Sequence, residues 1–346
     1  MQQLSSLDSA FIHAEGPNLP MHLATLTIYD PSTAAEGSVR FKDIMTQFEH
    51  AVYNVPLFRR RLLQVPLHLD QPYWVDDPDF DIEYHTRHIA LPKPGDWRQF
   101  YIQVARLNSR SIDRSRPLWE VYVIEGLNHL EGIPKGSFAI MMKLHHAALD
   151  GEALRSLYES IHTAEPESVS DVHVHASPLR RDALPGKLPL LVGAWQNTLK
   201  RSLSVGKVVG DTLRSYQRVQ KAASQGDIKH HHPTVKSRFN GQPSPYRAVT
   251  SASFSFDQAR QTRSAIPGAT INELVVTVIG GAVRQYLEHH QDLPEDSLVA
   301  QVPLSLNNGD EALPYGNNSP FVSLSIHSEI EDPLERFYAV HEEYRS

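Results

Sequence analysis

The sequence predicts an α/β protein made of two halves. Strand-like and helix-like segments alternate over residues 1–165, and the alternation resumes over residues 247–346. Residues 166–246, between them, are rich in Pro, Ser, Gly and His around one helix-like segment, a composition typical of a crossover linker. At 346 residues, the chain is long enough for two domains of ordinary size.

The first half contains three predicted strands and two predicted helices. Residues 22–29, 118–127 and 136–146 are rich in β-branched and aromatic side chains, which favours strands. Apolar residues recur at helical spacing over residues 41–55, and a second helix is expected over residues 151–165.

The second half is expected to follow a similar plan. Strands are predicted over residues 249–256, 299–305 and 321–326, and a helix over residues 271–289. A last helix is expected in the segment DPLERFYAVHEEYRS, inside which the sequence stops. This second half is therefore expected to be truncated by comparison with the first.

Composition narrows the classes of function. The chain has 33 basic and 40 acidic side chains, a net charge of -7 that argues against a nucleic-acid partner. It has no cysteine, which excludes disulfides, thiolate nucleophiles and zinc held by cysteine. The first residues show no secretory signal, and no apolar stretch reaches the roughly 18–20 residues of a membrane span. We expect a cytoplasmic protein, at most peripheral to the inner membrane or to lipid inclusions.

The strongest chemical signal is the run KLHHAALDG, which follows an apolar strand and precedes a predicted helix. A histidine at such a strand end, His145 or His146, can take a proton from a hydroxyl group at neutral pH. Asp150 can turn back to brace the loop, and Gly151 allows a backbone path that a side chain would obstruct. The structural alternative is a buried histidine pair followed by Asp150 as a helix cap.

A metal site is not expected at this run. His145 and His146 are adjacent, so along a strand they point to opposite faces, and the sequence offers no obvious third ligand.

The run HHAALDG resembles the HHxxxDG motif shared by CoA-dependent acyltransferases, including chloramphenicol acetyltransferase-like enzymes and the condensation domains of peptide synthetases. Further segments resemble one family in that group, the wax ester synthase/acyl-CoA:diacylglycerol acyltransferase family. They occur in the family's order over nearly the whole chain: LSSLDSAFIHAEGPNLPMHLATLTIYD, SRPLWEVYVIEGL, TINELVVTVIGGAVRQYL, PLSLNNG and YGNNSPFVSL. One departure is Asn272-Glu273, where the family usually has Asn-Asp.

The resemblance implies two chloramphenicol-acetyltransferase-like halves, each a mixed sheet with flanking helices, and a tunnel at their interface. Boundaries at 1–165, 166–246 and 247–346 follow for the first half, the linker and the second half. It implies transfer from acyl-CoA, as co-substrate, to a long-chain alcohol or diacylglycerol, with no bound cofactor. Wax esters or triacylglycerol would be the products.

The same resemblance assigns roles within the motif. His146 is expected to be the general base, while His145 supports the loop, Asp150 braces it and Gly151 keeps the turn tight. The tetrahedral oxyanion needs a hydrogen-bond donor from the second half, for which Asn272 and Ser305 are the candidates.

A basic amphipathic segment lies in the linker, over residues 199–223. Six Lys or Arg side chains oppose a single Asp there, a pattern found in helices that lie on anionic membranes. The alternative is an ordinary linker helix that packs on the core. Peripheral contact with a membrane or a lipid droplet is therefore one expectation, and the oligomeric state stays open.

Two other functions compete with an acyl-CoA-dependent enzyme. One is a condensation-type acyltransferase of the same superfamily that takes its donor from a carrier protein. The other is a truncated, lipid-binding relative that keeps the fold without turnover. The opening DSAF segment and the PLW segment favour the acyl-CoA-dependent family over the first alternative.

Overall fold

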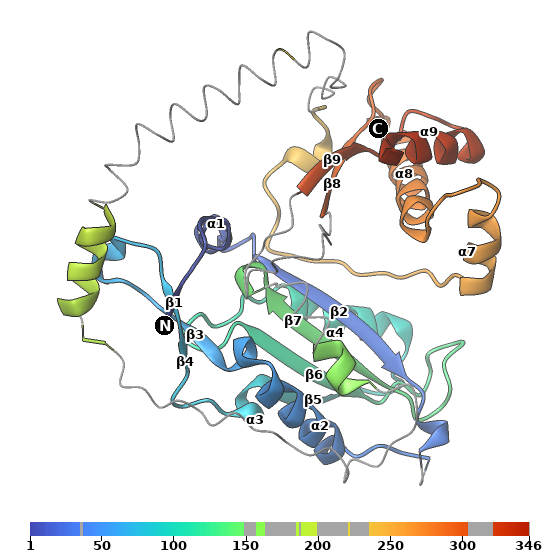
Figure 1. Cartoon of the computed structure of the whole chain (residues 1–346). Helices are drawn as coiled ribbons and strands as arrows, with labels where there is room; N and C mark the ends of the chain where they lie inside the picture. Colours follow the sequence, from blue (N-terminus) through green and yellow to red (C-terminus); the bar gives the residue numbers. More distant parts are fainter. Residues whose placement is uncertain are drawn as a thin grey trace. The chain divides into compact units, whose positions relative to one another are not determined.

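The computed structural model describes residues 1–34, 37–148, 157–162, 185–186, 188–198, 221, 235–303 and 321–345 (Figure 1). The chain divides into two compact units. The described part of the first unit runs to residue 198 and also includes Pro243–Thr250. The second unit holds residues 221 and 235–242 and the described residues from Ser251 onward.

The core of the first unit is a four-stranded mixed sheet. Its strands lie in the order β2 (His22–Tyr29), β7 (Phe138–His145), β6 (Trp119–Glu125) and β5 (Thr86–Ala90). Neighbours are antiparallel except for β5 and β6, which are parallel. All eight residues of β7 are buried, which explains why this strand reads as a continuous apolar run rather than an alternating one.

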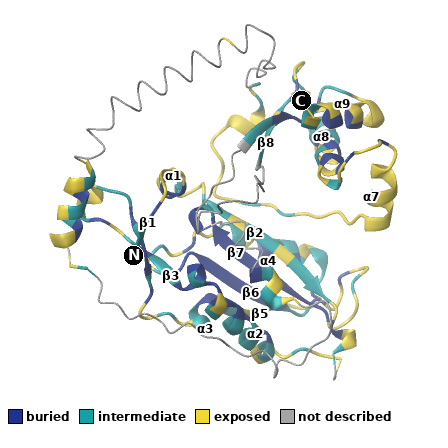
Figure 2. Cartoon of the chain, in the orientation of Figure 1, coloured by how far each residue is buried: buried dark blue, intermediate teal, exposed yellow. Residues whose placement is uncertain are grey.

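Helices cover both faces of this sheet, as the burial colours in Figure 2 show. Helix α2 (Phe41–Asn54) packs its apolar stripe on the face that carries Val121 and Ile140. Helix α4 (Trp97–Asn108) packs on the opposite face, against Tyr122 and Met141. Because successive strand residues point to opposite faces, the odd-numbered residues of β7, including Lys143 and His145, lie on the α4 side.

Smaller elements complete the first unit. A three-stranded antiparallel sheet is formed by β1 (Gln2–Gln3), β4 (Tyr73–Asp76) and β3 (Arg60–Leu63). Two further helices are α1 (Ser6–Ala14) and α3 (Ile82–His85). The described short 3-10 helices of the chain are η1 (Pro31–Thr33), η2 (Pro56–Arg59), η3 (Pro66–His68), η4 (His146–Ala148) and, in the second unit, η6 (Arg238–Asn240).

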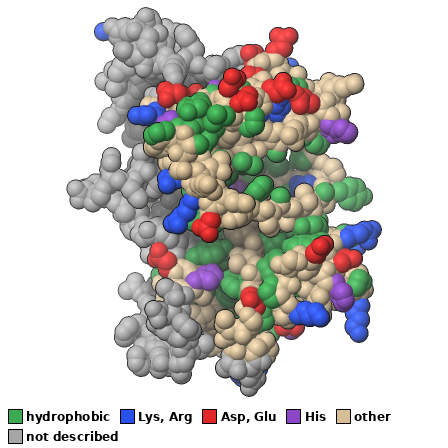
Figure 3. All heavy atoms as spheres, turned by 90° about the vertical axis from the view of Figure 1, so that its right-hand side faces the viewer, with side chains coloured by type: hydrophobic (Ala, Val, Ile, Leu, Met, Phe, Trp, Pro, Cys, Tyr) green, Lys and Arg blue, Asp and Glu red, His purple; other side chains and the backbone are tan. Residues whose placement is uncertain are grey.

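The second unit pairs strands β8 (Val299–Pro303) and β9 (Phe321–Ser325) antiparallel, and further helices of this unit lie among its described residues. The helices are α7 (Phe256–Arg263), α8 (Ile271–His289) and α9 (Pro333–Arg345). A side chain at Gly280 would overlap the carbonyl oxygen of Ile326, so glycine lets α8 approach the end of β9 closely. Figure 3 shows one face of the molecule, on which both hydrophobic and acidic side chains reach the surface.

Glu273, which stands where the resembling family has Asp, has a structural role at the start of α8. The hydroxyl of Thr270, the N-cap residue, accepts a hydrogen bond from the backbone N–H of Glu273 and donates to its carboxylate at 3.1 Å. The other carboxylate oxygen lies 2.7 Å from Nδ1 of His341 on α9. The longer side chain thus joins α8 to α9 while it is buried.

Most predicted elements are confirmed, and one is wrong. Strands β2, β6, β7, β8 and β9 and helices α2, α8 and α9 lie where the sequence predicts them, and the described part of the helix expected over 151–165, residues 157–161, is helical. Residues 249–255 form no strand with the described residues. Helix α7 begins at Phe256 because the Ser255 hydroxyl caps it by accepting from the N–H of Gln258.

Candidate active site

The two adjacent histidines lie where β7 ends. Strand pairing sets His22 of β2 opposite His145, and the N–H of His145 donates to the carbonyl of Leu118 at 3.0 Å. The next residue, His146, begins η4, and its N–H donates to the carbonyl of Met21 at 2.8 Å. The turn that carries both imidazoles is therefore held by backbone hydrogen bonds from two sides.

His145 is enclosed and its hydrogen bonds define its tautomer. Its side chain is fully buried, and its Nδ1 accepts the backbone N–H of Ala147 at 3.0 Å. The proton of the neutral ring therefore sits on Nε2, which faces the Glu15 carboxylate at 3.6 Å. Burial lowers the pKa of His145 to about 4, aided by Arg114, His146 and His22 and opposed by Glu15. The ring is neutral at physiological pH and holds the turn.

Glu15 connects three segments around His145. Its side chain is only 4 % exposed, and one carboxylate oxygen accepts a hydrogen bond from Nε of Arg114 at 2.6 Å. The other oxygen accepts the N–H of Met21, just before β2, at 3.4 Å. This carboxylate therefore ties the α4–β6 connection, the entry of β2 and the histidine turn together.

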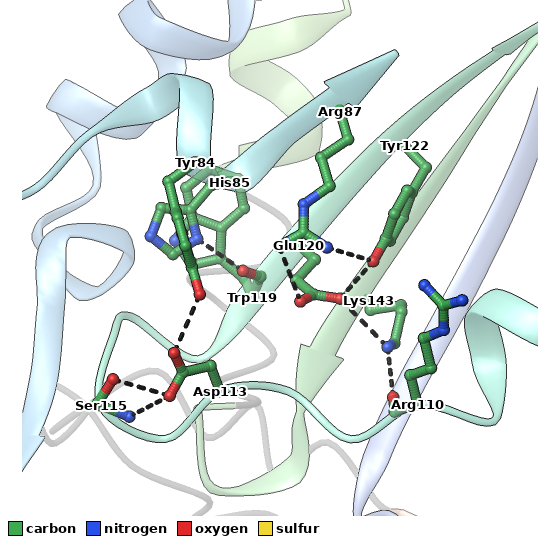
Figure 4. Close-up of polar contacts among 10 residues, drawn as sticks. All are labelled: Tyr84, His85, Arg87, Arg110, Asp113, Ser115, Trp119, Glu120, Tyr122 and Lys143. Carbon is green, nitrogen blue, oxygen red and sulfur yellow. Dashed lines mark hydrogen bonds and ion pairs between the residues drawn. The ribbon is translucent and has the colours of Figure 1, made fainter. Parts of the chain in front are cut away.

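A second polar cluster, centred on strands β6 and β7, also holds the α4–β6 connection (Figure 4). Lys143 of β7 is fully buried, and its ammonium group donates to the carbonyl of Arg110 at 2.6 Å and to the Glu120 carboxylate at 3.2 Å. Tyr122 donates to the same carboxylate at 2.7 Å, and the Arg87 guanidinium lies 3.7 Å from it. Burial lowers the pKa of Lys143, and the Glu120 charge opposes that shift.

His146 differs from His145 in exposure and surroundings. Its side chain is partly exposed, and its ring stacks on Phe11 of α1 with the ring centroids 5.1 Å apart. Burial lowers the pKa of His146 below the ordinary value of 6.5. The imidazole is therefore neutral at physiological pH, the state in which it can accept a proton from a hydroxyl group.

The remaining predicted site residues are distributed differently. Asp150, Gly151 and Ser305 lie outside the described residues. Asn272 belongs to the second unit, where it is exposed in the first turn of α8. The structure thus brings His145 and His146 together in one described turn of the first unit.

Sequence reasoning missed the residues that surround the two histidines. Glu15 and Phe11 lie in the opening segment on which the family resemblance rests, but no spacing rule links them to His145 and His146. Arg114 lies in a loop rich in charged residues, where any of several side chains could pair with an acid. The pairing of β2 with β7 brings the opening segment to the motif, and the sequence alone carries no signal for that pairing.

Comparison with known proteins decides the family. The wax ester synthase/diacylglycerol acyltransferase catalytic domain matches residues 4–275, well over half of the chain. The chain belongs to this family. It is an acyl-CoA-dependent O-acyltransferase by that membership, and the resemblance seen in the sequence is confirmed.

Individual relatives agree with this assignment. A putative diacylglycerol O-acyltransferase of Mycobacterium tuberculosis is 29% identical over 99% of this chain and 71% of its own length. A probable diacylglycerol O-acyltransferase of the same species is 30% identical over 96% of this chain and 70% of its own length.

Solved structures confirm the fold class. The wax ester synthase/diacylglycerol acyltransferase of Marinobacter aquaeolei has a TM-score of 0.61 at 24% identity, covering 99% of this chain and 72% of that one. The first condensation domain of the CDA synthetase has a TM-score of 0.56 at 15% identity, covering 99% and 73%. In the part of this family member that the structure describes, no helix has the length and apolarity needed to cross a bilayer.

Proposed function

We propose that this acyltransferase joins an acyl group from acyl-CoA to the hydroxyl of a fatty alcohol or diacylglycerol in one direct step, with His146 as general base. The observation that carries the proposal is the difference between the two histidines. His145 is fully buried and accepts a backbone N–H, whereas His146 is partly exposed and is kept neutral by burial. A general base needs access to substrate and a neutral ring that can accept a proton.

The chemistry needs no acyl-enzyme. His146 takes the proton from the alcohol as its oxygen attacks the thioester carbonyl, which gives a tetrahedral oxyanion. The carbon–sulfur bond then breaks, the ester forms, and the imidazolium returns the proton to the departing CoA thiolate. A chain without cysteine suits this direct route.

Other residues of the motif have supporting roles in this proposal. Asp150 and Gly151 shape the turn that follows His146, and Asn272 and Ser305 are the candidates for donating to the oxyanion. Removal of one hydrogen-bond donor to such an oxyanion typically lowers kcat by about 10²–10³-fold. No bound cofactor takes part in the scheme.

The main competing function uses an acyl group on a carrier protein instead of acyl-CoA. Condensation domains share the fold of this chain, which is why a carrier-bound donor is the alternative to test. Purified protein should be given palmitoyl-CoA with hexadecanol or dioleoylglycerol, and in parallel a palmitoyl-loaded carrier protein with the same acceptors. Ester formation with release of CoA supports the proposal. Ester formed only from the carrier supports the alternative, and no ester from either donor supports a lipid-binding relative without turnover.

The acceptors of this reaction partition into membranes, so we also infer that the chain works at a lipid surface. The support comes from the sequence, because the basic segment over residues 199–223 lies outside the described residues except at Lys221. Each Lys or Arg near an anionic surface contributes about 1 kcal/mol of binding free energy. Contact of this kind is peripheral and reversible.

A further inference from the structure

A cavity of about 740 Å³ lies in the first unit, between α4 and the segment 245–249. The helix side is one continuous face of α4 and its C-cap: Arg98, Tyr101, Ile102, Ala105, Arg106 and Ser109. Their spacing of three and four residues places them in a row along the helix. We call this cavity the α4 groove.

The lining of the α4 groove is positively charged. It contains three arginines, Arg98, Arg106 and Arg247, and no acidic side chain, although acids outnumber bases in the whole chain. Arg98 and Arg106 are exposed, and neither guanidinium group has a hydrogen-bond or ion-pair partner among the described residues. They are eight residues apart, which is about 12 Å along a helix axis. Two guanidinium groups are therefore available at separate points along one groove.

The wall opposite α4 is held in place by Arg247. Its guanidinium donates to the carbonyl of Asn18 at 2.7 Å and to the carbonyl of Tyr246 at 3.1 Å. These hydrogen bonds tie residues 245–249, which form no strand with the described residues, to the segment that precedes β2.

Both walls of the groove end near the histidine turn. Asn108, next to the lining residue Ser109, accepts a hydrogen bond from Nε2 of His22 at 3.0 Å through its carbonyl oxygen, and His22 pairs with His145. Asn18, which Arg247 contacts, lies three residues before Met21, whose carbonyl accepts the N–H of His146. One end of the α4 groove therefore lies near the end of the sheet that carries the proposed base.

We propose that the α4 groove binds the phosphate esters of a ligand, and that this ligand is the phosphorylated head of acyl-CoA. Guanidinium groups match phosphate oxygens with paired, charge-assisted hydrogen bonds. Tyr101, Ile102 and Val249 supply apolar area against which a nucleoside can pack. The identity of the ligand rests on the proposed function, because acyl-CoA is the acyl donor in that reaction. A phospholipid head group is the other source of the same chemistry.

The test measures binding and needs no turnover. Titration calorimetry with CoA, which lacks an acyl group to transfer, compares the wild-type chain with Arg98→Gln/Arg106→Gln. Sedimentation with phosphatidylglycerol and phosphatidylcholine vesicles tests the lipid source with the same two proteins. The control is Arg40→Gln/Lys42→Gln, which removes two exposed positive charges at the start of α2, the helix on the opposite face of the sheet.

The α4-groove variant should bind CoA at least roughly tenfold more weakly, since charged hydrogen bonds of this kind each affect affinity by about that factor. The control variant should bind CoA as the wild type does. Loss of vesicle binding with unchanged CoA affinity would assign the groove to lipid phosphate and overturn the donor assignment. If the α4-groove variant binds both CoA and vesicles as the wild type does, the α4 groove does not bind phosphate esters. CoA binding that persists in a chain without ester synthesis would instead contradict the proposed function alone.

Discussion

At the residue scale, two adjacent histidines differ because strand geometry sends them into different surroundings. His145 continues the face of β7 that α4 covers and is fully buried, while His146 starts the next turn and stacks on Phe11. The pKa of each ring is lowered, chiefly by burial. Their roles are separated by what each ring contacts and by its access to solvent.

The pH dependence of ester synthesis should report His146. The neutral ring is the active form, so kcat/KM should fall as pH decreases through the pKa of His146, which burial places below 6.5. Phe11→Ala removes the stacked ring, exposes the imidazole and should move this acidic limb upward toward 6.5. Rate profiles between pH 4.5 and 8 check both statements. If the acidic limb of the pH profile does not move in folded Phe11→Ala, a group other than His146 controls the rate.

Glu15 is expected to act as a positioning residue for the turn. Glu15→Gln keeps the shape but removes the charge that Arg114 and His145 face, so the turn should lose its anchor. A small displacement of the base can cost on the order of 10- to 100-fold in kcat. KM for acyl-CoA should change little. Glu83→Gln, at an exposed carboxylate of α3, is the matched control. Equal kinetics for the two variants would show that Glu15 does not position the histidine turn.

At the element scale, the buried pair of Lys143 and Glu120 holds the α4–β6 connection to the sheet. Lys143→Met leaves the Glu120 carboxylate buried without its ammonium partner, which should lower the free energy of unfolding by about 3–5 kcal/mol. Adding Glu120→Gln should restore part of that loss. Lys42→Met, at an exposed lysine of α2, is the control in denaturant titrations. A Lys143 variant as stable as this control would show that the pair contributes nothing.

How well each element was predicted depends on whether local sequence decides it. Residues 22–29 and 271–289 match β2 and α8 because their apolar periodicity is strong and long. Residues 249–255 alternate small and apolar residues as a strand would, but Arg247 anchors the neighbouring backbone to Asn18 instead of to a ladder. Strand formation needs a partner, and the partner is a property of the fold.

The candidate site shows the same division. The motif located His145 and His146 without any structure, since their spacing is local. Glu15 and Arg114 are 99 residues apart in sequence and meet only because β2 pairs with β7 and the α4–β6 connection returns to the same end of the sheet. Contacts of this kind depend on topology, which single-sequence patterns do not specify.

At the scale of the whole molecule, the proposed lipid-surface contact is expected to be electrostatic. Replacing Lys200, Arg201, Lys207, Arg214 and Arg218 with Gln should weaken sedimentation with anionic liposomes, most clearly at low salt. Turnover of a short, soluble alcohol should be spared, because the chemistry is elsewhere. Unchanged liposome binding would identify the segment as an ordinary packed linker.

Direct transfer with His146 as the base is tested by a single-turnover measurement of ester formation and CoA release. Palmitoyl-CoA and hexadecanol are mixed with excess wild-type protein, His146→Ala or His145→Ala, each shown to be folded by circular dichroism. We predict that His146→Ala loses about 10²–10⁴ in rate, the usual worth of a positioned base, that His145→Ala loses less, and that CoA and ester appear together. A greater loss in folded His145→Ala, or CoA released before ester forms, would contradict direct transfer with His146 as the base.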